Sequence, residues 1–178
     1  MTQDHQPTAF DDGRIDAFFA DRGVEMDAHR AVFETIRAAA ILVAVMEERA
    51  LRPLGLSHAG YRLLCELWIK GPLQPRDLAG FMMVSRPSIV GTIDTLQASA
   101  LVERARSTED RRQVTVALTD AGRRLVERAD AAWHIAQEQV TATLDPAEKR
   151  RLAELTRRAA SGALQLRQAL ALTDQPRA

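Results

Sequence analysis

The 178-residue chain has one cysteine and few aromatic residues, and both shortages limit what it can be. Because Cys65 stands alone, the chain can build neither a disulfide framework nor a cysteine-based metal site. Aromatic residues make up 4% of the chain, whereas all hydrophobic residues together make up 46%, with Leu and Ala dominant. This mixture is typical of a helical protein with an aliphatic core.

Long apolar runs and a signal peptide are also missing. No apolar run approaches the roughly 18 residues that span a bilayer, and no signal peptide precedes the acidic N-terminus. We therefore expect a cytoplasmic protein without a membrane partner. An enzyme is the least favoured class, since the sequence has no nucleophile–base pair, phosphate-binding loop or metal-ligand cluster, and it indicates neither a cofactor nor a metal.

The chain also lacks a net charge, so its overall charge does not indicate a nucleic-acid partner. The charge is uneven, however. Residues 1–27 carry seven acidic residues and two arginines, a net charge of −5, and the rest of this neutral chain therefore carries +5. A local basic surface remains open, and a local field is what steers a polyanion.

Apolar periodicity and capping residues predict six main helices. The first covers residues 27–51 and ends near Pro53 and Gly55. Ser57 caps the second, the third covers 74–81, and Ser85 caps a fourth that reaches about residue 99, with Pro87 in its first turn. Thr119 caps a fifth helix that covers 119–144, and Asp145, with Glu148 at the third helical position, caps a sixth that covers 146–172.

Two short strands, 101–105 and 113–118, are predicted on either side of a charged tip. Val114, Val116 and Leu118 would share one face of the second strand. Three helices followed by a two-stranded hairpin make a winged helix-turn-helix, so the fold class is mainly α. The long flanking helices are too apolar to stand alone in water and should pack on each other and on a second copy of the chain.

The predicted organisation has five parts. Residues 1–26 form an acidic arm, which is either a solubilising segment or contains a short extra helix around Ile15, Phe18 and Phe19. Residues 27–56 and 145–172 form dimerisation helices, residues 57–144 form the winged helix-turn-helix, and residues 173–178 form a mobile tail.

Three segments, "GLSHAGYRLLCEL", "GPLQPRDLAGFMMVSRPSIVGTIDTLQASALVER" and "STEDRRQVTVALTDAGRRL", resemble the MarR family of winged helix-turn-helix transcription regulators. The resemblance covers about residues 30 to 172. Its most specific part is Asp110-x-Arg112, a strand, and then Leu118, Thr119 and Gly122. The resemblance implies a homodimer that grips a palindromic operator in double-stranded DNA. Many members release DNA when they bind a small aromatic molecule or meet an oxidant.

The fourth predicted helix is the candidate for reading the major groove. With Ile89, Ile93 and Leu96 facing inward, the expected DNA-binding residues on this helix are Ser85, Arg86, Pro87, Ser88, Gly91 and Thr92. The helix departs from the family pattern, because Arg86 is its only basic residue and Asp94 is acidic. Few base contacts are therefore expected, with much of the affinity coming from the wing and from phosphates.

The tip of the hairpin is the second candidate. In the family pattern Arg112 is the residue that enters the minor groove, Asp110 orients it by pairing with its guanidinium, and Arg111 lies beside it. The expected flanking phosphate contacts are Arg104, Arg106, Arg111, Arg123 and Arg124. The alternative is that these arginines are only solvated charges on a turn, with no role in binding.

An effector pocket would be lined by His29, Tyr61 and Trp68, with Trp133 and His134 as further candidates. The alternative is that Tyr61 and Trp68 belong to the core and the histidines to the surface. Cys65 is interpreted as a small buried hydrophobic residue rather than a redox sensor.

These features predict a homodimeric regulator of transcription, acting as a repressor and released from DNA by a small effector. The alternative is a winged-helix dimer that works through protein contacts and does not bind DNA. The effector, the operator, the regulated genes and the sign of regulation are left open by the sequence.

Overall fold

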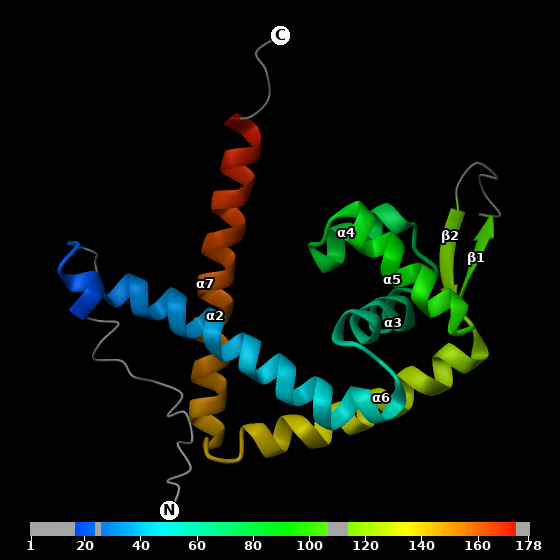
Figure 1. Cartoon of the computed structure of the whole chain (residues 1–178), viewed down its shortest axis with the longest axis horizontal. Coiled ribbons are helices and arrows are strands. Elements are labelled where there is room, and N and C mark those ends of the chain that lie inside the picture. The colour runs from blue at the N-terminus through cyan, green and yellow to red at the C-terminus, as the bar shows by residue number, and fades with distance from the viewer. Residues whose placement is uncertain (1–16, 24–25, 107–113, 174–178) are drawn as a thin grey trace, which may run out of the picture. The chain divides into compact units, whose positions relative to one another are not determined.

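The computed structural model describes residues 17–23, 26–106 and 114–173, without the side chains of residues 106 and 171–173. It separates into two compact units, residues 1–41 and residues 42–178. The elements (Figure 1) are α2 (Met26–Met46), the π-helical turn η1 (Glu47–Leu51), the 3-10 turn η2 (Arg52–Leu54), α3 (His58–Lys70), α4 (Pro75–Met82), α5 (Arg86–Ala98), β1 (Val102–Arg106), β2 (Val114–Leu118), α6 (Asp120–Val140) and α7 (Pro146–Thr173). This mainly helical chain with one two-stranded hairpin confirms the predicted fold class.

The first unit contains the start of α2 and a short helix over residues 17–20. The Phe19 ring lies against the His29 ring of α2, with 4.1 Å between centroids, and His29 stacks on Phe33 at 5.5 Å. A short extra helix is therefore present and contacts α2. Ile15 and the rest of residues 1–16 lie outside the described residues.

The helix predicted over 27–51 changes its hydrogen-bonding pattern at Met46. A π turn and then a 3-10 turn follow, because Pro53 cannot donate a backbone hydrogen bond, and Gly55 ends the run in the left-handed conformation (φ 70°). The π turn brings Leu51 fully into the core. It also lets Glu47 Oε2 accept the backbone N–H of His58, 3.0 Å away, at the start of α3.

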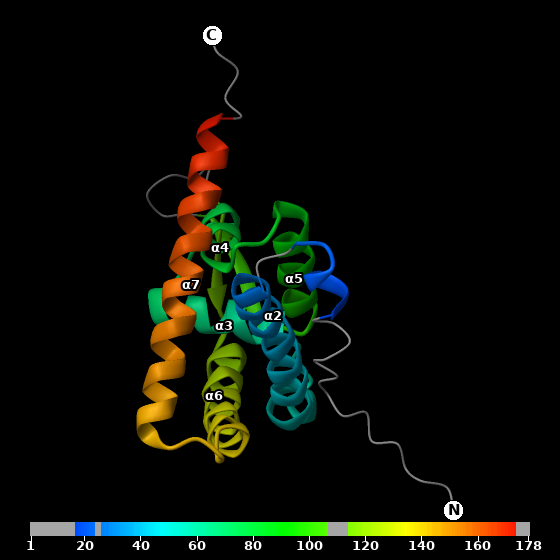
Figure 2. The same cartoon turned by 90° about the vertical axis from the view of Figure 1, so that its left-hand side faces the viewer.

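Local capping sets the starts of α3 and α5, as predicted. Ser57 Oγ accepts the N–H of Gly60 at 3.1 Å, and Ser85 Oγ accepts the N–H of Ser88 at 3.3 Å. Pro75 occupies the first turn of α4, where a missing N–H costs little, so this helix begins one residue later than predicted. Two views at right angles, Figures 1 and 2, show α3, α4 and α5 gathered beside the hairpin.

One aliphatic core holds the helix-turn-helix and the hairpin together. Its most deeply buried side chains come from η1, α3, α4, α5, both strands and α6: Leu51, Leu63, Leu64, Leu78, Ile89, Ile93, Val102, Val116 and Val126. Each of these side chains stabilises the fold by about 1.5–3 kcal/mol relative to an exposed position. The orientation of α5 is therefore fixed from its inner face.

The hairpin is antiparallel, with Val102 opposite Leu118 and Arg106 opposite Val114. Leu73, just before α4, adds a bridge on the other side of β2 and exchanges two backbone hydrogen bonds of 2.8 and 3.0 Å with Val116. Val116 is consequently fully buried, whereas Val114 near the tip is 43% exposed and Leu118 is half-buried, so the predicted strand face is buried most deeply at its centre.

Helix α6 ends at Val140, four residues earlier than predicted. Thr141 donates through both its N–H and its hydroxyl to the carbonyl of Gln137, and a turn over residues 141–144 follows. Asp145 and Glu148 then form the predicted capping box of α7, since the Asp145 carboxylate accepts the N–H of Glu148 and the Glu148 carboxylate accepts the N–H of Asp145. Thr173 ends α7, so the predicted tail begins inside this helix, and residues 174–178 lie outside the described residues.

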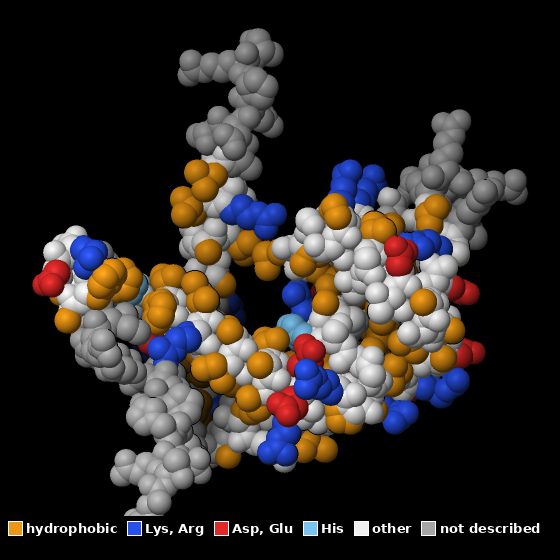
Figure 3. Space-filling view, viewed as in Figure 1, with side chains coloured by type: hydrophobic (Ala, Val, Ile, Leu, Met, Phe, Trp, Pro, Cys, Tyr) orange, Lys and Arg blue, Asp and Glu red, His pale blue; other side chains and the backbone are white. Residues whose placement is uncertain are grey.

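Both α2 and α7 present apolar side chains at the surface of the single chain. Val32 and Ile36 are 60% and 66% exposed, and Leu166 is 62% exposed. Figure 3 shows hydrophobic side chains along both helices. Within the described residues, these and the other helices are too short or too polar to cross a membrane.

Candidate nucleic-acid interface

Helix α5 packs one face against the core and exposes the other, which is called the bare face below. Ile89, Ile93 and Leu96 are buried, as predicted. The exposed residues of the helix are Arg86, Pro87, Ser88, Val90, Gly91, Asp94, Thr95, Gln97 and Ala98, whereas Thr92 is half-buried. The six residues predicted to contact DNA therefore lie at the N-cap, in the first turn and on or beside the bare face.

Gly91 lies near the middle of this face. A Cβ added there would meet nothing within 4 Å. The glycine is thus not required by packing, although it costs about 1 kcal/mol of helix stability relative to alanine. An unpacked glycine on an exposed helix face lets another surface approach the backbone closely.

Most hydroxyl groups along α5 are already used as donors within the helix. Thr92 Oγ1 donates to the Ser88 carbonyl at 3.0 Å, and Thr95 Oγ1 donates to the Gly91 carbonyl at 2.9 Å. Ser85 and Ser88 form a 2.8 Å hydroxyl pair in which one proton is shared. The second proton of this pair remains available as a donor at the start of the helix.

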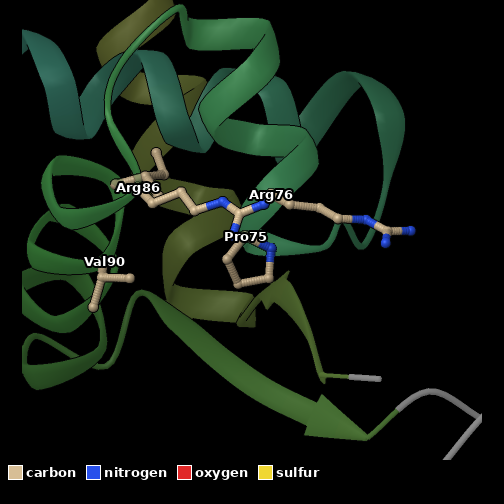
Figure 4. Close-up of a pocket in the computed structure, with 5 residues that line it drawn as sticks. Pro75, Arg76, Arg86 and Val90 are labelled. Carbon is tan, nitrogen blue, oxygen red and sulfur yellow. The ribbon is translucent and has the colours of Figure 1, made fainter. Parts of the chain in front are cut away.

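A recess of about 410 Å³ lies beside the start of α5 and is lined by Pro75, Arg76, Arg86, Ile89 and Val90. Figure 4 shows the Arg86 side chain extending from α5 toward Pro75 at the start of α4, while Arg76 points away from the recess. Two arginines, Arg76 and Arg86, therefore lie on this flank of α5. Sequence reasoning missed Arg76 and Val90, although Val90 follows Arg86 by one helical turn and is 42% exposed.

A second recess, of about 290 Å³, lies along another side of α5, toward the start of α3. Its lining is rich in hydroxyl groups and glycine, from Gly55, Ser57, Gly60, Ser88, Gly91, Thr92, Thr95 and Ser99, with Leu56, Leu96 and Leu101 completing it. Ser57 accepts a hydrogen bond from Gly60, which leaves its own proton to donate. This flank offers neutral donors and a close approach rather than charge.

The guanidinium of Arg104, which the sequence predicts as a phosphate contact, is paired with α5 within the chain. It donates from Nη2 to Asp94 Oδ1 at 2.6 Å and from Nη1 to Gln97 Oε1 at 2.7 Å. The acidic residue on α5 is therefore paired with a cation from β1. Arg123 and Arg124 are exposed on the first turns of α6.

The predicted wing residues Asp110, Arg111 and Arg112 lie outside the described residues, and so does the side chain of Arg106. The described part of the hairpin ends at residue 106 on one strand and begins again at residue 114 on the other.

The predicted effector residues are divided between the two units. His29 belongs to the first unit, and its Nε2 is buried without a hydrogen-bond partner among the described residues. Tyr61 is 6% exposed and belongs to the core, as the alternative interpretation held, and Trp68 packs against that core. The ring nearest to Tyr61 among the described contacts is Trp133 of α6, with centroids 5.1 Å apart.

Tyr61 joins α3 to α6 through a polar contact as well. Its hydroxyl donates to Asp130 Oδ1 at 3.1 Å, and burial raises the pKa of this phenol well above its usual range. Asp130 also lies 3.4 Å from Nε2 of His134. His58 stacks on Trp133 at 5.6 Å, and burial, followed by the nearby Arg62, lowers the pKa of its imidazole.

Cys65 is half-buried on α3 and packs against the core. Burial raises the pKa of its thiol, which keeps it in the unreactive protonated form at neutral pH. This environment suits the predicted packing role better than a redox-sensing role. In the described parts of the chain, no three His, Cys, Asp or Glu side chains lie together as metal ligands would.

Comparison with known proteins identifies the architecture. Residues 56–114 match the MarR family. The uncharacterised HTH-type transcriptional regulator YwaE of Bacillus subtilis is 29% identical over 124 residues, which are 70% of this chain and 72% of the relative.

Solved structures of two other proteins are similar to this chain. BpsR of Bordetella bronchiseptica, whose DNA binding is regulated by 6-hydroxynicotinic acid, has a TM-score of 0.66 and 26% identity over 74% of this chain and 98% of its own. A mutant MarR of E. coli in complex with operator DNA shares the fold, with a TM-score of 0.65 and 21% identity over 73% of this chain and 96% of its own. The helix-turn-helix and hairpin of this chain are thus similar in sequence to the MarR family and to an HTH-type transcriptional regulator, and similar in structure to a protein whose DNA binding is regulated by a small molecule.

Proposed function

We propose that the protein is a sequence-specific repressor that binds a palindromic operator as a homodimer and inserts α5 into the major groove. The observation that carries this proposal is the bare face of α5. It has an unpacked glycine, Gly91, near its centre, a mostly apolar recess bordered by Arg86 on one flank, and a recess rich in hydroxyl groups on another. A regulator that acted only through protein contacts is not favoured, because the relatives are helix-turn-helix transcription regulators.

The chemistry of the face defines how DNA would be read. Arg86 can donate two hydrogen bonds to a guanine, and Ser88 can donate to a base edge or a phosphate. Val90 offers an apolar contact of the kind that a thymine methyl group makes. Along the hydroxyl-rich recess, Ser57 can donate to phosphate oxygens without adding charge. Affinity would thus depend on few ionic contacts from the helix-turn-helix.

The exposed apolar faces of α2 and α7 support a homodimer. Ile36 and Leu166 are more than half exposed in the single chain, and contiguous apolar surface on long helices favours association. A dimer that binds a palindrome would present its two α5 helices about 34 Å apart, one turn of B-DNA. The wing residues Arg111 and Arg112, oriented by Asp110, remain the predicted minor-groove contact.

We propose a small aromatic acid as the effector, since BpsR responds to 6-hydroxynicotinic acid. Binding would release DNA only to the extent that the ligand prefers a dimer whose α5 helices are wrongly spaced.

Selection of duplexes from a random pool, followed by fluorescence anisotropy on the best sequence, tests this proposal. Arg86→Ala should weaken binding to the selected duplex by about 5- to 150-fold, corresponding to about 1–3 kcal/mol for a base contact. The matched control is Arg128→Ala, which removes an exposed arginine of α6 and should change affinity by less than about twofold. Equal effects of both substitutions, or failure to enrich any sequence, would refute the proposed readout.

A further inference from the structure

The ion pair between Asp94 and Arg104 joins the two elements that a winged helix brings to DNA. Asp94 and Gln97 lie three residues apart on α5, and together they hold one guanidinium from β1 through hydrogen bonds of 2.6 and 2.7 Å. Both bonds are short, and the bond to Asp94 is charge-assisted. An arginine held by two acceptors on one helix has a defined position, which a solvated surface side chain lacks.

The burial of the pair shows which partner is held. The Arg104 side chain is 34% exposed and that of Asp94 is 57% exposed. Arg104 thus lies against the helix, while Asp94 is the more open of the two. A guanidinium committed in this way has fewer N–H groups to offer to a phosphate.

The turn between α5 and β1 gives a second, independent reason for a restraint at this place. Only residues 99–101 connect the two elements, and Ala100 among them has a left-handed backbone (φ 55°). A residue with a Cβ is disfavoured in that conformation, which glycine adopts freely. The Thr119 hydroxyl donates to the Ala100 carbonyl at 2.7 Å and helps to hold the turn.

We propose that Asp94, Gln97 and Arg104 form a latch that fixes the β1–β2 hairpin against α5, so that helix and hairpin meet DNA in one set geometry. Asp94 and Arg104 are thereby positioning residues for DNA binding. This inference rests on the proposed function, and it gives a role to the acidic side chain on a helix proposed to face a polyanion.

The latch predicts that removing the charge of Asp94 weakens DNA binding, whereas simple electrostatics predicts that it strengthens binding. If Asp94 acted only through its charge, Asp94→Asn would tighten DNA binding by removing repulsion. If Arg104 contacted a phosphate, Arg104→Gln would weaken binding and reduce the slope of log affinity against log salt by about one unit or less. In the latch, both substitutions loosen the same hairpin.

A double-mutant cycle on the full-length protein separates these cases. We expect Asp94→Asn and Arg104→Gln each to weaken binding to a selected duplex by about tenfold, with an unchanged salt slope. The double variant should bind no more weakly than the weaker single variant. Asp94→Asn binding as tightly as the wild type or tighter, or two effects that multiply, would overturn the latch.

One further measurement and one comparison of variants test the latch independently. Hydrogen exchange of the β1 and β2 amides without DNA should be faster in both single variants, while the amides of α7 should exchange at wild-type rates. Unchanged exchange in the hairpin would overturn the latch whether or not DNA binds. If Arg86→Ala weakens DNA binding but Asp94→Asn does not, the latch fails and the proposed function stands. If neither substitution has an effect, the proposed readout through α5 fails as well.

Discussion

Replacing Gly122 with alanine should damage the fold at the junction of hairpin and α6. Gly122 is buried in the first turn of α6, and its N–H donates to the capping hydroxyl of Thr119 at 3.0 Å. A Cβ built on it would lie 2.0 Å from the carbonyl oxygen of Leu101, whereas ordinary contacts begin at 3.4 Å. The two backbone segments would therefore have to separate by more than an ångström.

Several restraints oppose that separation. The same Leu101 carbonyl accepts the Thr119 N–H at 3.1 Å and lies 3.2 Å from its hydroxyl, so moving α6 strains the cap as well. Adding one carbon to a packed site that cannot yield typically costs 1–3 kcal/mol, and the loss of a cap adds about 1 kcal/mol. We expect Gly122→Ala to lower the free energy of unfolding by about 2–4 kcal/mol.

Urea denaturation followed by far-UV circular dichroism measures this loss, and the thermal midpoint should fall by about 5–15 °C. Gly91→Ala is a matched control, because it makes the same chemical change on an exposed helix where the new Cβ meets nothing within 4 Å. It should raise stability by up to about 1 kcal/mol. Wild-type stability for Gly122→Ala, or equal effects of the two substitutions, would refute the reasoning.

Three other predictions follow from the site. Although Gly91→Ala should stabilise the fold, it should weaken binding to a selected duplex severalfold, because a methyl group would stand on the face proposed to approach DNA. Anisotropy titration measures the affinity. Unchanged affinity would count against close approach at this residue. Tyr61→Phe should lower the free energy of unfolding by about 1 kcal/mol, since Asp130 loses its hydrogen-bond donor, and urea denaturation measures the change. The lowered pKa of His58 means that the unfolded chain takes up a proton near pH 6.5 and the folded chain only at lower pH, so stability present above pH 6.5 should be lost progressively as the pH falls below that value. Urea midpoints between pH 7.5 and 5 should show this slope, and His58→Gln should flatten it; an unchanged slope would contradict the assignment.

The capping residues show what local sequence can predict. Ser57, Ser85, Thr119 and Asp145 were identified from residue type and spacing, and each accepts a backbone N–H at the start of its helix. These hydrogen bonds connect residues no more than three positions apart, so the information needed to place them lies within one turn.

Asp94 shows what local sequence cannot predict. Taken alone, an acidic residue on the helix predicted to read DNA departs from the family pattern. Its partner Arg104 is ten residues away, and the pair forms only because the hairpin folds back beside α5.

The recess beside Arg86 was missed for the same reason. It is formed by α4 and α5 together, and the relation between Arg76 and Arg86 depends on how the two helices cross. The exposed position of Val90, by contrast, could have been predicted, since it lies one turn after Arg86 and away from Ile89 and Ile93 on the helix.

Sedimentation equilibrium of the full-length protein with a fluorescent, selected palindromic duplex tests the central claim most directly. Two chains per duplex should be found, and the complex should dissociate when Arg86 is replaced by alanine at the same protein concentration. A folded protein that leaves the duplex free, or that binds it as one chain, would contradict the account.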